Sequence, residues 1–181
     1  MLEWLLYYTS YCLAGLTLKL GDDLLDELGR PTLATAPLAL SGLLFGLIMT
    51  VSELDLVLLT AIVIGVLLSG KVNRPQFLVG FLMIGVVLIV IGVPVITSWL
   101  EWFALLTALL LAAVLDERGN DWAEGGNSPW VTLFFRYRFA LKLAVLLLAV
   151  VWPDFLPSAV GLWFFDLGYE ATARAVRVMS T

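Results

Sequence analysis

The sequence predicts an all-α fold, a polytopic bundle of about seven membrane-spanning helices, on three observations. Of the 181 residues, 61% are hydrophobic and 14% are charged, whereas an average soluble domain has about 25% charged residues. Several apolar runs approach the length of about 20 residues that a helix needs to cross a bilayer. When the predicted spans are followed in alternation, all ten basic residues fall on one side of the membrane.

Seven segments fit or nearly fit a span, and the loops between them are short. The first segment lacks the preceding basic residues of a cleaved signal peptide, so we expect it to be retained. The fourth contains Pro94 near its end, where a terminal turn tolerates proline. The predicted spans are residues 2–20, 33–51, 54–69, 77–97, 99–115, 131–152 and 158–178. The chain is expected to be a single transmembrane domain over residues 1–181, with no soluble domain.

The basic residues determine the orientation, because cytoplasmic loops carry an excess of Lys and Arg. The opposite loops contain acidic residues and no basic ones: Glu3, Glu53, Asp55, Glu101 and Asp154. We therefore expect the N-terminus outside, the C-terminus in the cytoplasm, and any chemistry at the cytoplasmic face of the cell membrane. Trp99, Trp102 and Trp152 fit an aromatic belt on the outer side.

The composition excludes several classes of function. The chain has no histidine, which removes Ser-His-Asp hydrolysis and His-ligated zinc or haem. Its one cysteine, Cys12, cannot form an internal disulfide. The net charge is −5 and no basic stripe is present, so nucleic-acid binding is not expected.

Four acidic residues lie within six positions just after the first span. Carboxylates this close repel each other unless a cation lies between them. If the first helix continues, Asp22 and Asp26 lie one turn apart on one face. Mg²⁺ takes one or two carboxylates and completes its shell with waters and phosphates, so Asp22, Asp23 and Asp26 predict a Mg²⁺ site, with Asp23 and Asp26 catalytic. The alternative is a solvated acidic loop with local ion pairs.

A second acidic stretch follows the fifth span. Asp116 and Asp121 could hold a second Mg²⁺ ion that faces the first across a cavity, with Asp116 in a catalytic role. Gly119 lies between them and is a potential helix break. The alternative is a polar helix cap and turn.

A third acidic pair lies in the predicted seventh span. Asp166 would then be inside the bilayer, and an intramembrane carboxylate is a functional candidate by default. Glu170 lies four residues before Arg174 and could simply pair with it. If the segment instead lies along the interface, Asp166 and Glu170 belong to its wet face.

Four basic residues are candidate phosphate ligands: Lys19, Arg30, Lys71 and Arg74. Lys71 and Arg74 share a short predicted cytoplasmic turn. The alternative for all four is ordinary anchoring of cytoplasmic loops by positive charge.

The stretch Asp22-Asp23-Leu24-Leu25-Asp26, followed by Arg30-Pro31, resembles a shortened first acidic motif of the UbiA-type membrane prenyltransferases. The stretch 116–121 loosely resembles their second acidic motif. The resemblance implies an all-helical fold, Mg²⁺, a prenyl diphosphate donor and transfer to a lipid or aromatic acceptor.

Taken together, these features predict a Mg²⁺-dependent transferase that acts on a lipid or prenyl diphosphate at the cytoplasmic face. Two alternatives stay open. One is a cation transporter or channel with Asp166 and Glu170 on the ion path. The other is a non-catalytic membrane subunit whose cytoplasmic acids bind a partner.

Overall fold

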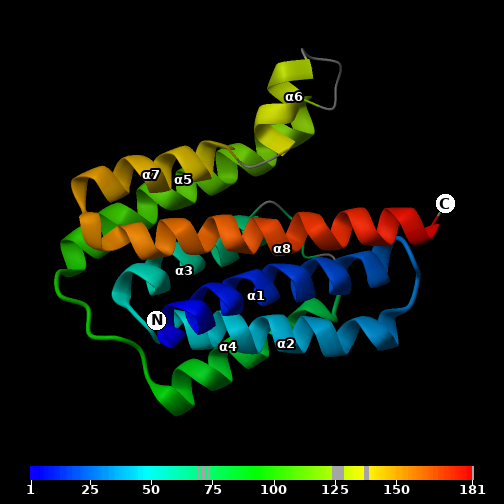
Figure 1. Cartoon of the computed structure of the whole chain (residues 1–181), viewed down its shortest axis with the longest axis horizontal. Coiled ribbons are helices and arrows are strands. Elements are labelled where there is room, and N and C mark those ends of the chain that lie inside the picture. The colour runs from blue at the N-terminus through cyan, green and yellow to red at the C-terminus, as the bar shows by residue number, and fades with distance from the viewer. Residues whose placement is uncertain (69, 71, 73, 124–128, 137–138, 181) are drawn as a thin grey trace. The chain divides into compact units, whose positions relative to one another are not determined.

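The structure is a computed structural model that describes residues 1–68, 70, 72, 74–123, 129–136 and 139–180. Within these ranges, only the backbone is described for residues 120, 121, 123, 129, 131, 132, 136, 179 and 180. The described residues form helices and turns and contain no strand (Figure 1). The predicted all-α class is therefore confirmed.

Eight α-helices and one short 3₁₀ helix follow one another along the described chain. Their bounds are α1 Leu2–Asp26, α2 Pro31–Met49, α3 Glu53–Leu68, α4 Phe77–Ile91, α5 Trp99–Ala123, α6 Pro129–Arg136, α7 Phe139–Val151, η1 Pro153–Phe155 and α8 Leu156–Ser180. Helix α1 continues to Asp26, as the predicted one-face arrangement of Asp22 and Asp26 required.

Three boundaries differ from the sequence-based expectation. Helix α4 ends at Ile91 because Gly92 adopts φ 99°, a conformation that favours glycine, and Pro94 follows shortly after. Helix α5 continues through Gly119, so this glycine does not break it. The predicted span 131–152 is described as two helices, α6 and α7, on either side of residues 137–138, which lie outside the described residues.

The chain divides into two compact units. The first consists of Met1–Ser52, Arg74–Pro94 and Val160–Thr181, and the second of Glu53–Asn73 and Val95–Ala159. The first unit therefore contains α1, α2, α4 and most of α8, and the second contains α3, α5, α6, α7 and η1.

The helices of the first unit pack with their backbones close together. A Cβ atom at Gly15 of α1 would overlap the carbonyl oxygen of Phe165 in α8, and one at Gly168 of α8 would overlap the carbonyl oxygen of Cys12 in α1. Gly42 of α2 meets the backbone of Gly80 in α4 in the same way. Small residues that admit such close approach are typical of helix packing in membranes.

The second unit has its own apolar core. Helix α3 packs against α5, and α5 packs against α6 and α7. Val57, Leu58, Leu109 and Val145 are fully or almost fully buried there. This core holds together the ends of α3, α5 and α7, which carry most of the polar residues of the unit.

Two of the described helical segments are long and apolar enough to cross a membrane, Pro31–Met49 and Trp99–Gly119. Helices α4 and α7 are apolar but shorter. Large apolar side chains nevertheless face outward on both, among them Ile89 at 85% and Val150 at 80% exposure. The full set of seven spans remains a prediction.

We expect the substitution Gly168→Ala to lower the free energy of unfolding by about 1–3 kcal/mol, because the new Cβ would push α8 away from α1. Gly85→Ala in α4 is the matched control, since nothing lies within 4 Å of its Cβ position. Alanine there should be neutral or stabilising by up to about 1 kcal/mol. Thermal unfolding in detergent, followed by circular dichroism, would measure both. Equal effects would show that the close approach is not tight.

Candidate functional site

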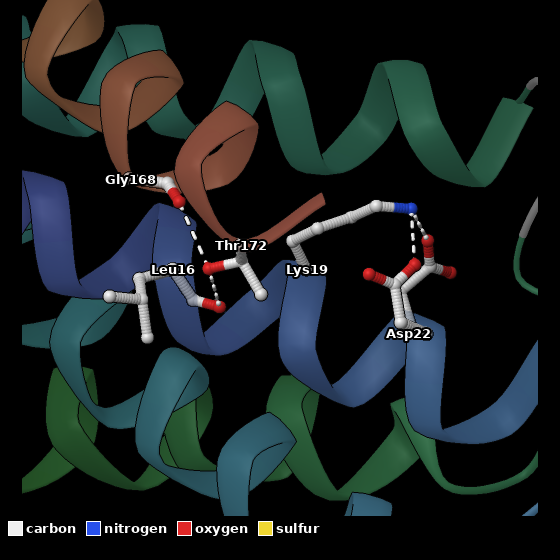
Figure 2. Close-up of polar contacts among 6 residues, drawn as sticks. Leu16, Lys19, Asp22, Gly168 and Thr172 are labelled. Carbon is white, nitrogen blue, oxygen red and sulfur yellow. Dashed lines mark hydrogen bonds and ion pairs between the residues drawn. The ribbon is translucent and has the colours of Figure 1, made fainter. Parts of the chain in front are cut away.

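The C-terminal end of α1 carries an ion-pair group that we call the Lys19 cluster, made of Lys19, Asp22 and Asp23. The Lys19 Nζ atom lies 3.0 Å from Asp22 Oδ2 and 2.7 Å from Asp23 Oδ1 (Figure 2). The spacings of three and four residues place all three side chains on one face of the helix. One ammonium group therefore serves two carboxylates.

Helix α8 borders this cluster. The Thr172 hydroxyl lies within hydrogen-bonding distance of the carbonyl oxygens of Leu16, at 3.3 Å, and Gly168, at 3.1 Å, and so links α8 to α1 (Figure 2). One turn earlier on α8, the ring of Tyr169 lies under the Lys19 ammonium, with 5.4 Å between Nζ and the ring centroid. An aromatic ring attracts a cation at this distance, so α8 adds a second favourable contact for Lys19.

The two carboxylates of the cluster differ in their exposure. The Asp23 side chain is 2% exposed and that of Asp22 is 30% exposed. Burial raises the pKa of the Asp23 carboxyl above its ordinary value, and the neighbouring Lys19 ammonium opposes this effect. Asp23 Oδ2 is buried and has no hydrogen-bond partner among the described residues. The charged form of Asp23 is thus only partly stabilised by the chain itself.

The other predicted ligands of this region lie at its exposed edge. The Nε atom of Arg74 lies 4.0 Å from Asp26 Oδ1, and both side chains are 55% exposed. Arg30 is exposed at the residue that precedes α2. Lys71 lies outside the described residues.

The predicted Mg²⁺ site of Asp22, Asp23 and Asp26 remains a prediction, and two of its three residues share the Lys19 ammonium. Across the described ranges, no group of three acidic or cysteine side chains is gathered closely enough to hold a metal ion. Asp22 and Asp23 do share one cation, and one oxygen of Asp23 has no hydrogen-bond partner among the residues that the structure describes. Because Mg²⁺ needs only one or two carboxylates when waters and phosphates complete its shell, this pair fits an ion that is bound together with a phosphate.

Asp116 is a residue of α5 in the second unit, and its side chain lies at the start of α7. Its Oδ1 accepts the backbone N–H of Ala140 at 3.0 Å, and its Oδ2 accepts that of Leu141 at 2.7 Å. A carboxylate in this position satisfies free N–H groups of a helix N-terminus and complements its dipole. Asp116 thus stabilises the start of α7, a helix that begins more than twenty residues further along the chain. The side chain of Asp121 lies outside the described part of the chain.

Asp166 and Glu170 are both half-buried on α8. They lie in the stretch that packs against α1, between Phe165 and Thr172. Asp23 belongs to the first unit and Asp116 to the second, so a second Mg²⁺ ion that faces the first across a cavity remains a prediction.

Two contacts at polar side chains were not predicted from the sequence. One is the Tyr169 ring under Lys19, and the other is Thr97, whose hydroxyl and backbone N–H both donate to Glu53 at 2.8 Å. The members of each pair are far apart in the sequence. No local spacing in the sequence predicts such contacts. The sequence placed Glu53 only among the acidic residues of the outer loops.

Comparison of the chain with models of protein families, with characterised proteins and with solved structures finds no match. Function is therefore argued from the residues themselves.

Removal of the shared cation should destabilise the first unit. We expect Lys19→Met to cost about 2 kcal/mol of unfolding free energy, because a charged hydrogen bond to buried Asp23 is lost. The double variant Lys19→Met with Asp23→Asn should recover part of that loss. Chemical unfolding in detergent would measure this cycle. Asp22→Asn is the control and should cost less than about 1 kcal/mol, since Asp22 is more exposed. Additive losses at Lys19 and Asp23 would contradict the pairing.

The capping role of Asp116 predicts that two substitutions at this position lower the free energy of unfolding by different amounts. Asp116→Ala should cost about 1–2 kcal/mol, because two N–H groups at the start of α7 lose their acceptor. Asp116→Asn retains one side-chain oxygen and should cost less. Thermal unfolding of both variants would test this, and equal stability of wild type and Asp116→Ala would exclude the cap.

Proposed function

We propose that this chain is a membrane-embedded helical protein that binds a lipid or prenyl diphosphate, together with Mg²⁺, at the Lys19 cluster. We further propose that it acts as a transferase on that substrate from the cytoplasmic face. The observation that carries the proposal is the buried Asp23 carboxylate, which shares Lys19 with Asp22 and has one oxygen without a hydrogen-bond partner in the described part of the chain.

The apolar surface supports the membrane part of the proposal. Soluble monomers rarely expose large continuous apolar patches. On α4, Leu82, Ile89 and Val90 are each more than 60% exposed. Such a surface suits contact with lipid tails, and α2 is long and apolar enough to span the bilayer beside it.

The charged residues at the edge of the first unit support the proposal that a diphosphate head group binds there. The Asp26–Arg74 pair is exposed and its atoms are 4.0 Å apart, which is weak for an ion pair. An incoming phosphate can therefore compete for the Arg74 guanidinium at low cost. Arg30 is a second exposed guanidinium in the same unit. Arginine favours phosphate because its N–H groups can donate two parallel hydrogen bonds.

Asp22 and Asp23 would hold the Mg²⁺ ion. When bound, such an ion screens phosphate charge and stabilises a departing diphosphate. The residues of the chain would supply the rest: Lys19 offsets part of the charge of the two carboxylates, Arg74 orients the phosphate, and the apolar faces hold the lipid tail.

Binding of farnesyl diphosphate to the purified full-length protein would test this proposal. We expect it to raise the melting temperature when Mg²⁺ is present and to have little effect in EDTA, because the ion would bridge the carboxylates and the phosphate. Farnesol, which has the tail without the phosphates, should not reproduce the shift. The absence of any Mg²⁺-dependent shift would overturn the proposal.

Two variants make the test specific for the site. Arg74→Gln should weaken binding of the diphosphate by about tenfold, the value of one lost charge-assisted hydrogen bond. Arg118→Gln removes another exposed arginine, from α5 in the second unit, and should leave binding unchanged. If both variants weaken binding equally, the effect comes from net charge and the assigned site is wrong.

A further inference from the structure

A pocket of about 110 Å³ lies in the second unit, where the starts of α3 and α5 meet the end of α7. Acidic, hydroxyl and indole side chains form most of its wall: Glu53, Thr97, Glu101, Trp102, Trp152 and Asp154. A water molecule in the liquid occupies about 30 Å³. The pocket therefore admits a small head group and excludes a large ligand.

The described residues that line the pocket include three carboxylates and no basic side chain. Glu53 is oriented by Thr97, which donates its backbone N–H and its hydroxyl to the two carboxylate oxygens at 2.8 Å each. No lysine or arginine is among the residues described as lining the pocket. The pocket thus favours a positively charged occupant.

The spacing of the carboxylates argues against a bare metal ion. In the described part of the chain, no three acidic side chains approach closely enough to form a metal site, although Glu53, Glu101 and Asp154 line the same pocket. Carboxylates that line a pocket but do not come together at one point suit a larger cation, such as an alkylammonium group.

The two indole rings provide the apolar part of such a site. Trp faces attract alkylammonium groups, and rings of this kind form the known cages for quaternary ammonium ligands. The indole Nε1 of Trp102 is buried and has no hydrogen-bond partner among the described residues.

From this pocket we infer a second binding site, for the ammonium group of a small amine or of a lipid head group. Glu101 and Asp154 neutralise the positive charge, Trp102 and Trp152 pack against the methyl or methylene groups, and the Glu53–Thr97 pair fixes the wall. The site lies in the second unit and is independent of the diphosphate site proposed for the first.

Choline chloride is the first probe, titrated against the full-length protein in detergent at constant ionic strength and followed by tryptophan fluorescence. Two of the lining residues are indoles, so occupancy should produce a saturable change in emission. The second arm uses the protein in nanodiscs of phosphatidylglycerol with or without phosphatidylethanolamine. A response to choline alone identifies a free amine, and suppression of that response by phosphatidylethanolamine identifies a lipid head group; both outcomes support the site.

The double variant Glu101→Gln with Asp154→Asn should weaken choline binding at least about tenfold. Glu3→Gln with Glu27→Gln removes the same number of charges from the first unit and should leave the midpoint unchanged. If the first double variant does not fold, Glu101→Gln alone should show a smaller loss in the same direction. The inference is overturned by no saturable response in either arm, by unchanged binding in the pocket variants, or by a response to Ca²⁺ that choline cannot reproduce.

Discussion

The close approach of α1 and α8 is the constraint on which the contact between Lys19 and Tyr169 depends. Gly15 and Gly168 lack a side chain, and carbonyl groups of the opposite helix occupy the space that a Cβ atom would need. Because the backbones meet there, Tyr169, the next residue along α8, lies against the Lys19 ammonium. A packing feature of two glycines therefore determines an electrostatic contact, since any separation of the helices would move the ring away from the cation.

The contact between Lys19 and Tyr169 matters because the positive and negative charges of the Lys19 cluster do not balance. One ammonium faces two carboxylates, so the Lys19 cluster retains a formal negative charge. Within the described chain, one oxygen of the more buried carboxylate also has no hydrogen-bond partner. Folding tolerates a buried charge only when it is paired and hydrogen-bonded. A residual negative charge at a half-buried position is a reason to expect an external cation there, and this is the physical link between the fold and the proposed Mg²⁺ site.

Local sequence patterns predicted the helices better than they predicted the site. The apolar runs identified most of the helical segments, because hydrophobicity and helix formation depend on near neighbours. They did not reveal that α5 continues through Gly119, since packing against Phe135 compensates for the low helix propensity of glycine. They also did not predict that the Asp116 carboxylate accepts hydrogen bonds from the start of α7. Contacts of this kind join residues distant in sequence, which no local spacing records.

The acidic groups of the two units differ in how many basic side chains lie close to them. Asp22, Asp23 and Asp26 have Lys19 or Arg74 close by, so the chain itself supplies most of the compensating charge. Around the pocket of the second unit the described lining residues include three carboxylates and no basic side chain. Hydrogen bonds from Thr97 stabilise one of them without adding positive charge. The positive charge that balances these carboxylates must come from solvent or from a ligand. Because Trp102 and Trp152 contribute large apolar surfaces to the pocket, they favour a ligand that has apolar surface of its own.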